Sequence, residues 1–144
     1  MRIYLACTVR GDRRTVESAR QISRSLTRLG HEVLTGHLLE EDVERSEAQL
    51  SDAAIFKRDV GWLDQCDALV AEASGSSFGV GFEVGYVLAR ATSTRQRVFL
   101  FYDAGRRSSI SRIIPGIVHP ACRVLAYHSI DEIDALIASV VGQA

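Results

Sequence analysis

Short apolar segments alternate with longer helical periods along this 144-residue chain, and this alternation constrains the fold more than any other feature. The short segments are rich in Val, Leu, Ile and aromatic residues, as buried strands are. They cover residues 2–7, 32–36, 67–73, 97–102 and 122–127. Alternating strands and helices are typical of a parallel sheet with right-handed crossovers. The sequence therefore predicts an α/β fold with an open, doubly wound, five-stranded parallel sheet of the Rossmann or flavodoxin type and helices on both faces.

Apolar residues between these segments recur every three or four positions, as on the buried face of a helix. Three such periods have clear limits: residues 16–29, 80–91 and 130–140. The first is followed by Gly30, a typical helix stop. A second helical stretch covers residues 48–63, but residues 38–50 are too polar to place its start. No linker or repeat divides the sequence, so we expect a single domain over residues 1–144.

Composition and charge exclude several classes of partner. Hydrophobic residues make up 47% of the chain, charged residues 24%, and the formal net charge is -1. This profile gives no bulk field for a nucleic acid polymer or an anionic membrane, and no apolar run is long enough to span a bilayer. The N-terminus lacks the features of a signal peptide. Three widely spaced cysteines without a CxxC pair predict neither disulfides nor a zinc site. We therefore expect a cytoplasmic protein.

The segment "SGSSFGVGFEVG", residues 74–85, places glycines and serines directly after the third apolar segment. Free backbone N–H groups and the positive end of the helix dipole converge at such a strand-to-helix turn and can bind an anion. Ser77 adds a hydroxyl donor, and Gly79 permits close approach of a ligand to the backbone. A glycine-rich turn also occurs simply to make the connection, so the segment alone does not establish a binding site.

Two acidic residues share helical faces with apolar side chains. Glu83 lies one turn from Val80 and Val87, and Asp59 lies one turn after Ile55. An inward carboxylate is costly unless it is paired or used. Glu83 could instead stabilise the helix terminus, whose dipole would favour its ionised form, and Asp59 could pair with an arginine. If both face one crevice, they favour acid–base or glycoside chemistry.

Other polar candidates follow the predicted strands, where ligands bind in open parallel sheets. Arg10, after the first strand, could bind phosphate through its guanidinium or be a solvated loop charge. His37 follows the second strand and could be an ordinary loop residue. Arginines surround Ser111 in a later loop. That loop could contact phosphate or be merely solvated.

Four segments, in order, resemble the nucleoside 2-deoxyribosyltransferase superfamily: "IYLACTVRG", "HLLE", "RDVGWLDQCDALVAEAS" and "SSFGVGFEVGYVLA". Within it they are most similar to the 2′-deoxynucleoside 5′-monophosphate N-glycosidases, and the resemblance covers nearly the whole chain. It implies hydrolysis of the bond between base and deoxyribose in a small nucleotide substrate. It also implies that neither a metal nor an organic cofactor takes part. Cys7 stands where that family usually has glycine.

The resemblance also implies roles for individual residues. Glu83 would be the nucleophile that forms a covalent deoxyribosyl intermediate, Asp59 the proton donor to the base, and Tyr4 the residue that orients the carboxylate. A homodimer is implied, in which Ser111 reaches the phosphate of the neighbouring site. The implied substrate-binding residues are Thr8, Val9, Arg10, Gly11, His37, Ser77, Gly79 and Ser111.

Ser77 helps to choose among the branches of this family. Transferases that act on unphosphorylated nucleosides usually have an acidic residue at this position, which would repel phosphate, whereas serine beside helix N–H groups can bind it. The sequence therefore favours hydrolysis of a monophosphate. Three alternatives stay open: the same reaction on a ribonucleotide such as CMP, deoxyribosyl transfer between bases, and a non-catalytic nucleotide sensor.

Overall fold

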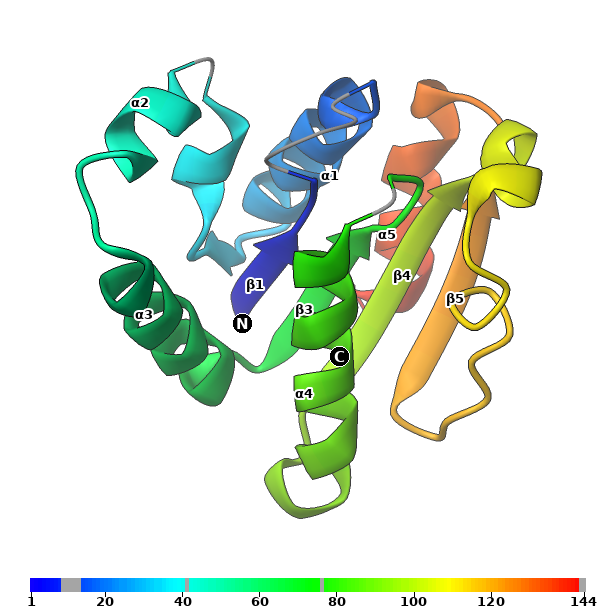
Figure 1. Ribbon diagram of the computed structural model, residues 1–144. Coiled ribbons are helices and arrows are strands. Elements are labelled where there is room, and N and C mark those ends of the chain that lie inside the picture. Colours follow the sequence, from blue (N-terminus) through cyan, green and yellow to red (C-terminus); the bar gives the residue numbers. More distant parts are fainter. Residues whose placement is uncertain (9–13, 41, 76, 143–144) are drawn as a thin grey trace.

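The computed structural model describes residues 1–8, 14–40, 42–75 and 77–142, and its five parallel strands form one sheet in the order β2-β1-β3-β4-β5 (Figure 1). The strands are β1 Arg2–Ala6, β2 Glu32–Val33, β3 Ala68–Glu72, β4 Arg97–Asp103 and β5 Cys122–Tyr127. The predicted open, doubly wound parallel sheet is thus confirmed. The edge strand β2 is shorter than predicted because the side chain of Thr35, not its backbone, pairs with β1. Its Oγ1 accepts from the N–H of Leu5 at 3.0 Å and donates to the Leu5 carbonyl at 2.6 Å.

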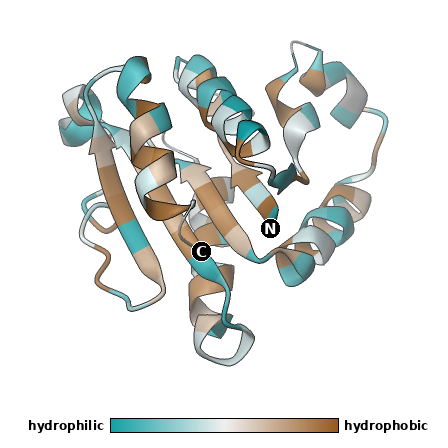
Figure 2. Ribbon diagram, turned by 180° about the vertical axis from the view of Figure 1, so that it is seen from behind, coloured by the Kyte–Doolittle hydropathy of each residue, from teal (hydrophilic) through white to brown (hydrophobic). Residues whose placement is uncertain are grey.

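Helices cover both faces of the sheet (Figure 1). The helices α1 Val16–Arg28 and α5 Ile133–Val140 pack on one face, and α3 Asp52–Gln65 and α4 Phe78–Thr94 on the other. A short helix, α2 Val43–Glu47, precedes α3. Successive strand residues alternate between the two faces, so Ile3 and Leu5 join the core under α1 while Tyr4 joins the core under α4. Figure 2 shows the apolar sheet between helices of mixed hydropathy.

Capping residues set the helix boundaries. Gly30 follows α1 with φ of 81°, a conformation that favours glycine, as expected of a helix stop. The predicted helical stretch over residues 48–63 is only partly helical, because Ser51 begins α3 by accepting a hydrogen bond from the N–H of Ala54 at 3.2 Å. Ser77 begins α4 in the same way, accepting from the N–H of Val80 at 3.3 Å.

The buried carboxyl group of Glu72, at the end of β3, joins segments that lie at the carboxyl ends of the strands. Thr15 Oγ1 donates to Oε2 at 2.6 Å and Tyr127 OH donates to Oε1 at 2.8 Å. Ser74 donates through both its N–H and its hydroxyl, and its hydroxyl oxygen accepts from the N–H of Asp103 at 2.7 Å. Burial raises the pKa of Glu72, and the hydrogen bonds oppose that rise. One side chain therefore fixes the start of α1, the ends of β4 and β5, and the loop before α4.

Replacing this carboxyl group should destabilise the whole fold. Glu72→Leu leaves the N–H of Ser74 and the hydroxyls of Thr15 and Tyr127 without their acceptor, so we expect the free energy of unfolding in urea to fall by about 3 kcal/mol or more. Glu72→Gln keeps one carbonyl oxygen and should lose less. The exposed Glu32→Gln is the control, with a change below about 0.5 kcal/mol. Equal stabilities of Glu72→Leu and the control would contradict the role of Glu72.

Candidate active site

Tyr4 and Glu83 form a hydrogen bond between the sheet and α4. Tyr4 is fully buried in β1, and its hydroxyl donates to Glu83 Oε1 at 2.6 Å. Burial and the neighbouring Glu83 charge raise the pKa of Tyr4, so its hydroxyl stays protonated and remains a donor. The orientation of the Glu83 carboxyl group is therefore fixed by a residue of the central sheet.

The pKa of Glu83 is raised to about 7, chiefly by burial. The hydrogen bond from Tyr4 opposes this rise, and the negative charge of Asp59 adds to it. The expectation that the helix terminus would favour the ionised form is wrong, because Glu83 lies beyond the first turn of α4 and loses more from desolvation than it gains from the dipole. Both forms of Glu83 are thus populated near neutral pH, and the ionised fraction grows as pH rises.

Asp59 belongs to a chain of charged groups that connects α3 with α2. Its Oδ1 accepts from Arg58 Nε at 2.8 Å, and Arg58 Nη1 donates to Glu47 Oε1 at 2.7 Å. The guanidinium group of Arg58 lies over the ring of Trp62, 4.9 Å from its centroid. His37 completes the group, with Nε2 3.5 Å from Glu47 Oε1. The arginine pairing considered for Asp59 therefore exists, and Asp59 also lines a cavity.

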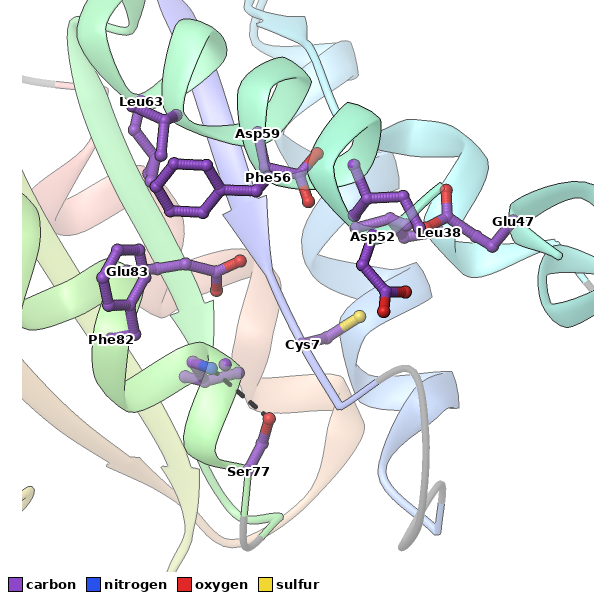
Figure 3. Close-up of a pocket in the computed structure, with 14 residues that line it drawn as sticks. Cys7, Leu38, Glu47, Asp52, Phe56, Asp59, Leu63, Ser77, Phe82 and Glu83 are labelled. Carbon is purple, nitrogen blue, oxygen red and sulfur yellow. Dashed lines mark hydrogen bonds between the residues drawn. The ribbon is translucent and has the colours of Figure 1, made fainter. Parts of the chain in front are cut away.

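Both acidic residues line a cavity of about 440 Å³ on the α3 and α4 side of the sheet (Figure 3). Glu83 and Ser77 contribute from the α4 side, and Leu38 and Glu47 from the opposite side. The remaining described lining residues are Cys7, Asp52, Ile55, Phe56, Asp59, Val60, Leu63, Gly79, Val80 and Phe82. The cavity therefore joins the two carboxylates to the start of a helix.

The start of α4 forms the polar end of this cavity. Ser77 caps the helix, and the N–H groups of its first turn have no partner within the helix. A Cβ atom on Gly79 would meet Ser77 Oγ at 3.6 Å, an ordinary contact, so protein atoms do not fill the space beside it. An anion such as a phosphate group suits this position.

The other predicted site residues are distributed differently. Thr8 follows β1, is buried, and its Oγ1 has no hydrogen-bond partner among the described residues. His37 is not among the described residues that line the cavity, and it approaches the site through Glu47. Ser111 lines a second cavity of about 410 Å³ that shares Ser77 and Phe82 with the first. Three predicted residues lie outside the described part of the chain: Val9, Arg10 and Gly11.

Sequence reasoning did not select Glu47 or Arg58. Arg58 stands directly before Asp59 in "KRD", which was a usable signal, whereas Glu47 is one of several acids in a polar stretch without periodicity. Within the described ranges, no three His, Cys, Asp or Glu side chains come together as a metal site would require. No helix of that same part of the chain has the length and apolarity needed to cross a membrane.

An open parallel sheet with two carboxylates and a helix start around one cavity defines an α/β domain suited to cleaving a phosphorylated glycoside. The family model described as nucleoside 2-deoxyribosyltransferase matches residues 3–139, and the chain belongs to this family. A relative from Thermofilum pendens, named as a 2′-deoxynucleoside 5′-phosphate N-hydrolase, is 36% identical over 132 residues, covering 92% of this chain and 89% of the relative. A relative from Danio rerio, named 5-hydroxymethyl-dUMP N-hydrolase, is 32% identical over 139 residues, covering 95% and 93%.

A solved structure shares the fold. The CMP N-glycosidase BcmB of Clostridium botulinum superimposes with a TM-score of 0.70 at 18% sequence identity. The match covers 97% of this chain and all of that chain, 100%. The likeness therefore extends over the whole sheet and its helices.

Tyr4→Phe should move the ionisation of Glu83 to higher pH. The variant removes the hydrogen bond that lowers the pKa of Glu83, so burial and Asp59 act unopposed and the pKa should rise above about 7. Carbon-13 NMR titration of the glutamate carboxyl groups measures this shift. Tyr86→Phe is the matched control, because Tyr86 OH donates to Asp64 at 2.7 Å on the outer surface. A pKa of Glu83 that stays the same or falls in Tyr4→Phe would count against the assigned contact.

Proposed function

We propose that this chain hydrolyses the N-glycosidic bond of 2′-deoxynucleoside 5′-monophosphates and releases the free base and deoxyribose 5-phosphate. The observation that carries the proposal is the 2.6 Å hydrogen bond by which Tyr4 orients Glu83 inside a cavity shared with Asp59 and the start of α4. The names of the relatives from Thermofilum pendens and Danio rerio support the same reaction class.

The mechanism assigns one step to each part of the cavity. The phosphate binds at Ser77 and Gly79, which brings the sugar beside Glu83. The Glu83 carboxylate attacks C1′ while the bond from C1′ to the base nitrogen breaks, and Asp59, protonated in the reactive form of the site, gives its proton to the leaving base. Water then attacks C1′ of the glycosyl ester, releasing the Glu83 carboxylate and returning a proton to Asp59. Glu83 must be ionised to attack while Asp59 must carry the proton that it donates, so turnover should pass through a maximum with pH and fall on both sides of it.

Glu83→Gln should abolish base release and keep nucleotide binding, because the amide fills the same space without being a nucleophile. Purified protein is incubated with deoxynucleoside and ribonucleoside monophosphates, and free base is followed by chromatography. We expect turnover to fall by at least about 10³-fold. The exposed Glu32→Gln serves as the control and should retain turnover.

The same assay separates this reaction from its alternatives. Unchanged base release in Glu83→Gln would refute the mechanism, and faster release from CMP than from dCMP would assign the enzyme to ribonucleotides. Exchange onto a second free base would indicate a transferase. Tight binding of monophosphates without release of any base would indicate a nucleotide sensor.

The proposal includes a homodimer in which Ser111 completes the neighbouring site. Large apolar side chains are exposed around the second cavity: Phe78 is 100% exposed, Ile113 74% and Phe82 51%. A patch of this kind on a monomer marks an interaction surface, and a twofold dimer would cover the same patch on both copies. Ser111 lies in this patch and is absent from the described lining of the cavity that contains Glu83. We infer that its hydroxyl contacts the phosphate of the partner's site, as the resemblance to the family implies.

Mixing two variants with different defects tests this arrangement. We expect Ser111→Ala to raise KM for the monophosphate and Glu83→Gln to be inactive, both as dimers in analytical ultracentrifugation. After exchange of subunits, the site with Glu83 from one copy and Ser111 from the other should regain the low KM. As the exchange control, Ser111→Ala is mixed with Glu32→Gln, which retains wild-type turnover. Sedimentation as a monomer, or no recovery of low KM after verified exchange, would exclude a shared site.

We place the protein in the cytoplasm. Its proposed substrates are small nucleotides, and its three cysteines, all within the described part of the chain, carry thiols and not disulfides. A reducing compartment maintains that state.

A further inference from the structure

The geometry of the cavity determines where the base of a nucleotide must lie, given the proposed function. If the phosphate binds at Ser77 and the sugar lies beside Glu83, the base extends away from α4. That part of the cavity is lined by Leu38, Glu47, Asp52, Ile55 and Phe56. Figure 3 shows Leu38 and Glu47 on the side opposite to Glu83 and Ser77. Ile55 and Phe56 provide apolar contact for a ring, while Glu47 and Asp52 provide hydrogen-bond acceptors.

Glu47 is the buried acid of this region. It ends α2 and is only 8% exposed. The hydrogen bond from Arg58 is the main cause that lowers the pKa of Glu47, so the group is ionised at neutral pH. Its contacts with Arg58 and His37 both involve Oε1, at 2.7 Å and 3.5 Å. Among the described residues, Oε2 has no recorded partner and remains able to accept a hydrogen bond.

The cation next to Glu47 is held away from the base. Arg58 donates to Glu47 and to Asp59 and stacks on Trp62, so its guanidinium group is fixed between two carboxylates. Of the described residues that line the cavity, four are acidic and none is Lys, Arg or His. The side chains around the base therefore offer acceptors and few donors, since an ionised carboxylate only accepts hydrogen bonds.

We propose that Glu47 is a specificity residue that selects bases with an exocyclic amino group, such as cytosine and adenine, over their oxo counterparts, uracil and hypoxanthine. An amino group donates to the free carboxylate oxygen. A carbonyl oxygen at the same ring position faces it with a second acceptor, which leaves two buried acceptors unsatisfied and adds repulsion. The inference rests on the proposed function, because it concerns the base of the substrate of that site.

Matched nucleotide pairs test the inference without other changes in the substrate. We expect kcat/KM of the wild-type chain to favour dCMP over dUMP, and dAMP over dIMP, by at least about 10-fold, the usual value of one hydrogen bond to a charged group. In Glu47→Gln both ratios should fall toward one, because the amide can donate to an oxo group. Its carbonyl oxygen still accepts from Arg58, so the contact between α2 and α3 is kept.

Glu32→Gln is the control. Glu32 is an exposed acid of the edge strand β2 and is not among the described residues that line the cavity, so both ratios should stay at their wild-type values. Equal kcat/KM for the two members of each pair in the wild-type chain would overturn the inference, as would wild-type ratios in Glu47→Gln. In either case base release would still support the proposed function. Release of no base from any of the four nucleotides would instead refute the proposed function itself.

Discussion

The hydrogen bond between Tyr4 and Glu83 is the interaction on which the organisation of this site depends. It places a carboxyl group in the apolar interface between the sheet and α4, where a carboxylate without a partner would be costly. Tyr4 can serve as partner only because β1 lies inside the sheet, next to β3, and turns this side chain toward α4. Strand order, side-chain alternation and helix register together place the Tyr4 hydroxyl next to Glu83 Oε1. This position raises the pKa of Glu83. It also leaves the ionised carboxylate poorly solvated and therefore more reactive.

Charge separates the two ends of the cavity. The acids Glu47, Asp52, Asp59 and Glu83 would repel a phosphate group placed among them, whereas the N–H groups at the start of α4 attract it. The proposed orientation of the nucleotide, with its anion at the helix and its neutral base among the acids, agrees with this division of charge. The same division explains how a chain with a net charge of only -1 can bind an anion: the field is local and made by backbone dipoles.

The sequence predicted what depends on local patterns. The strand segments, the stop at Gly30 and the start of the helix after Ser77 follow from periodicity and capping chemistry, and so does the inward side of Glu83. The pKa of Glu83 was not predictable, because it reflects how deeply the folded protein desolvates the group. Arg58 and Glu47 were missed for a related reason. Their ion pair joins α3 to α2 across an irregular connection, and no periodic pattern in the sequence indicates it.

Glu72 has a consequence for the order in which the chain folds. Its partners Thr15 and Tyr127 lie 57 and 55 residues away, in opposite directions along the sequence. Closing such long loops is entropically unfavourable until the strands between them have paired. The carboxyl group can therefore acquire its full set of donors only after the last strand, β5, has docked. The carboxyl ends of β3, β4 and β5 are thus tied together only at a late stage, when the N-terminal and C-terminal parts of the chain are both in place.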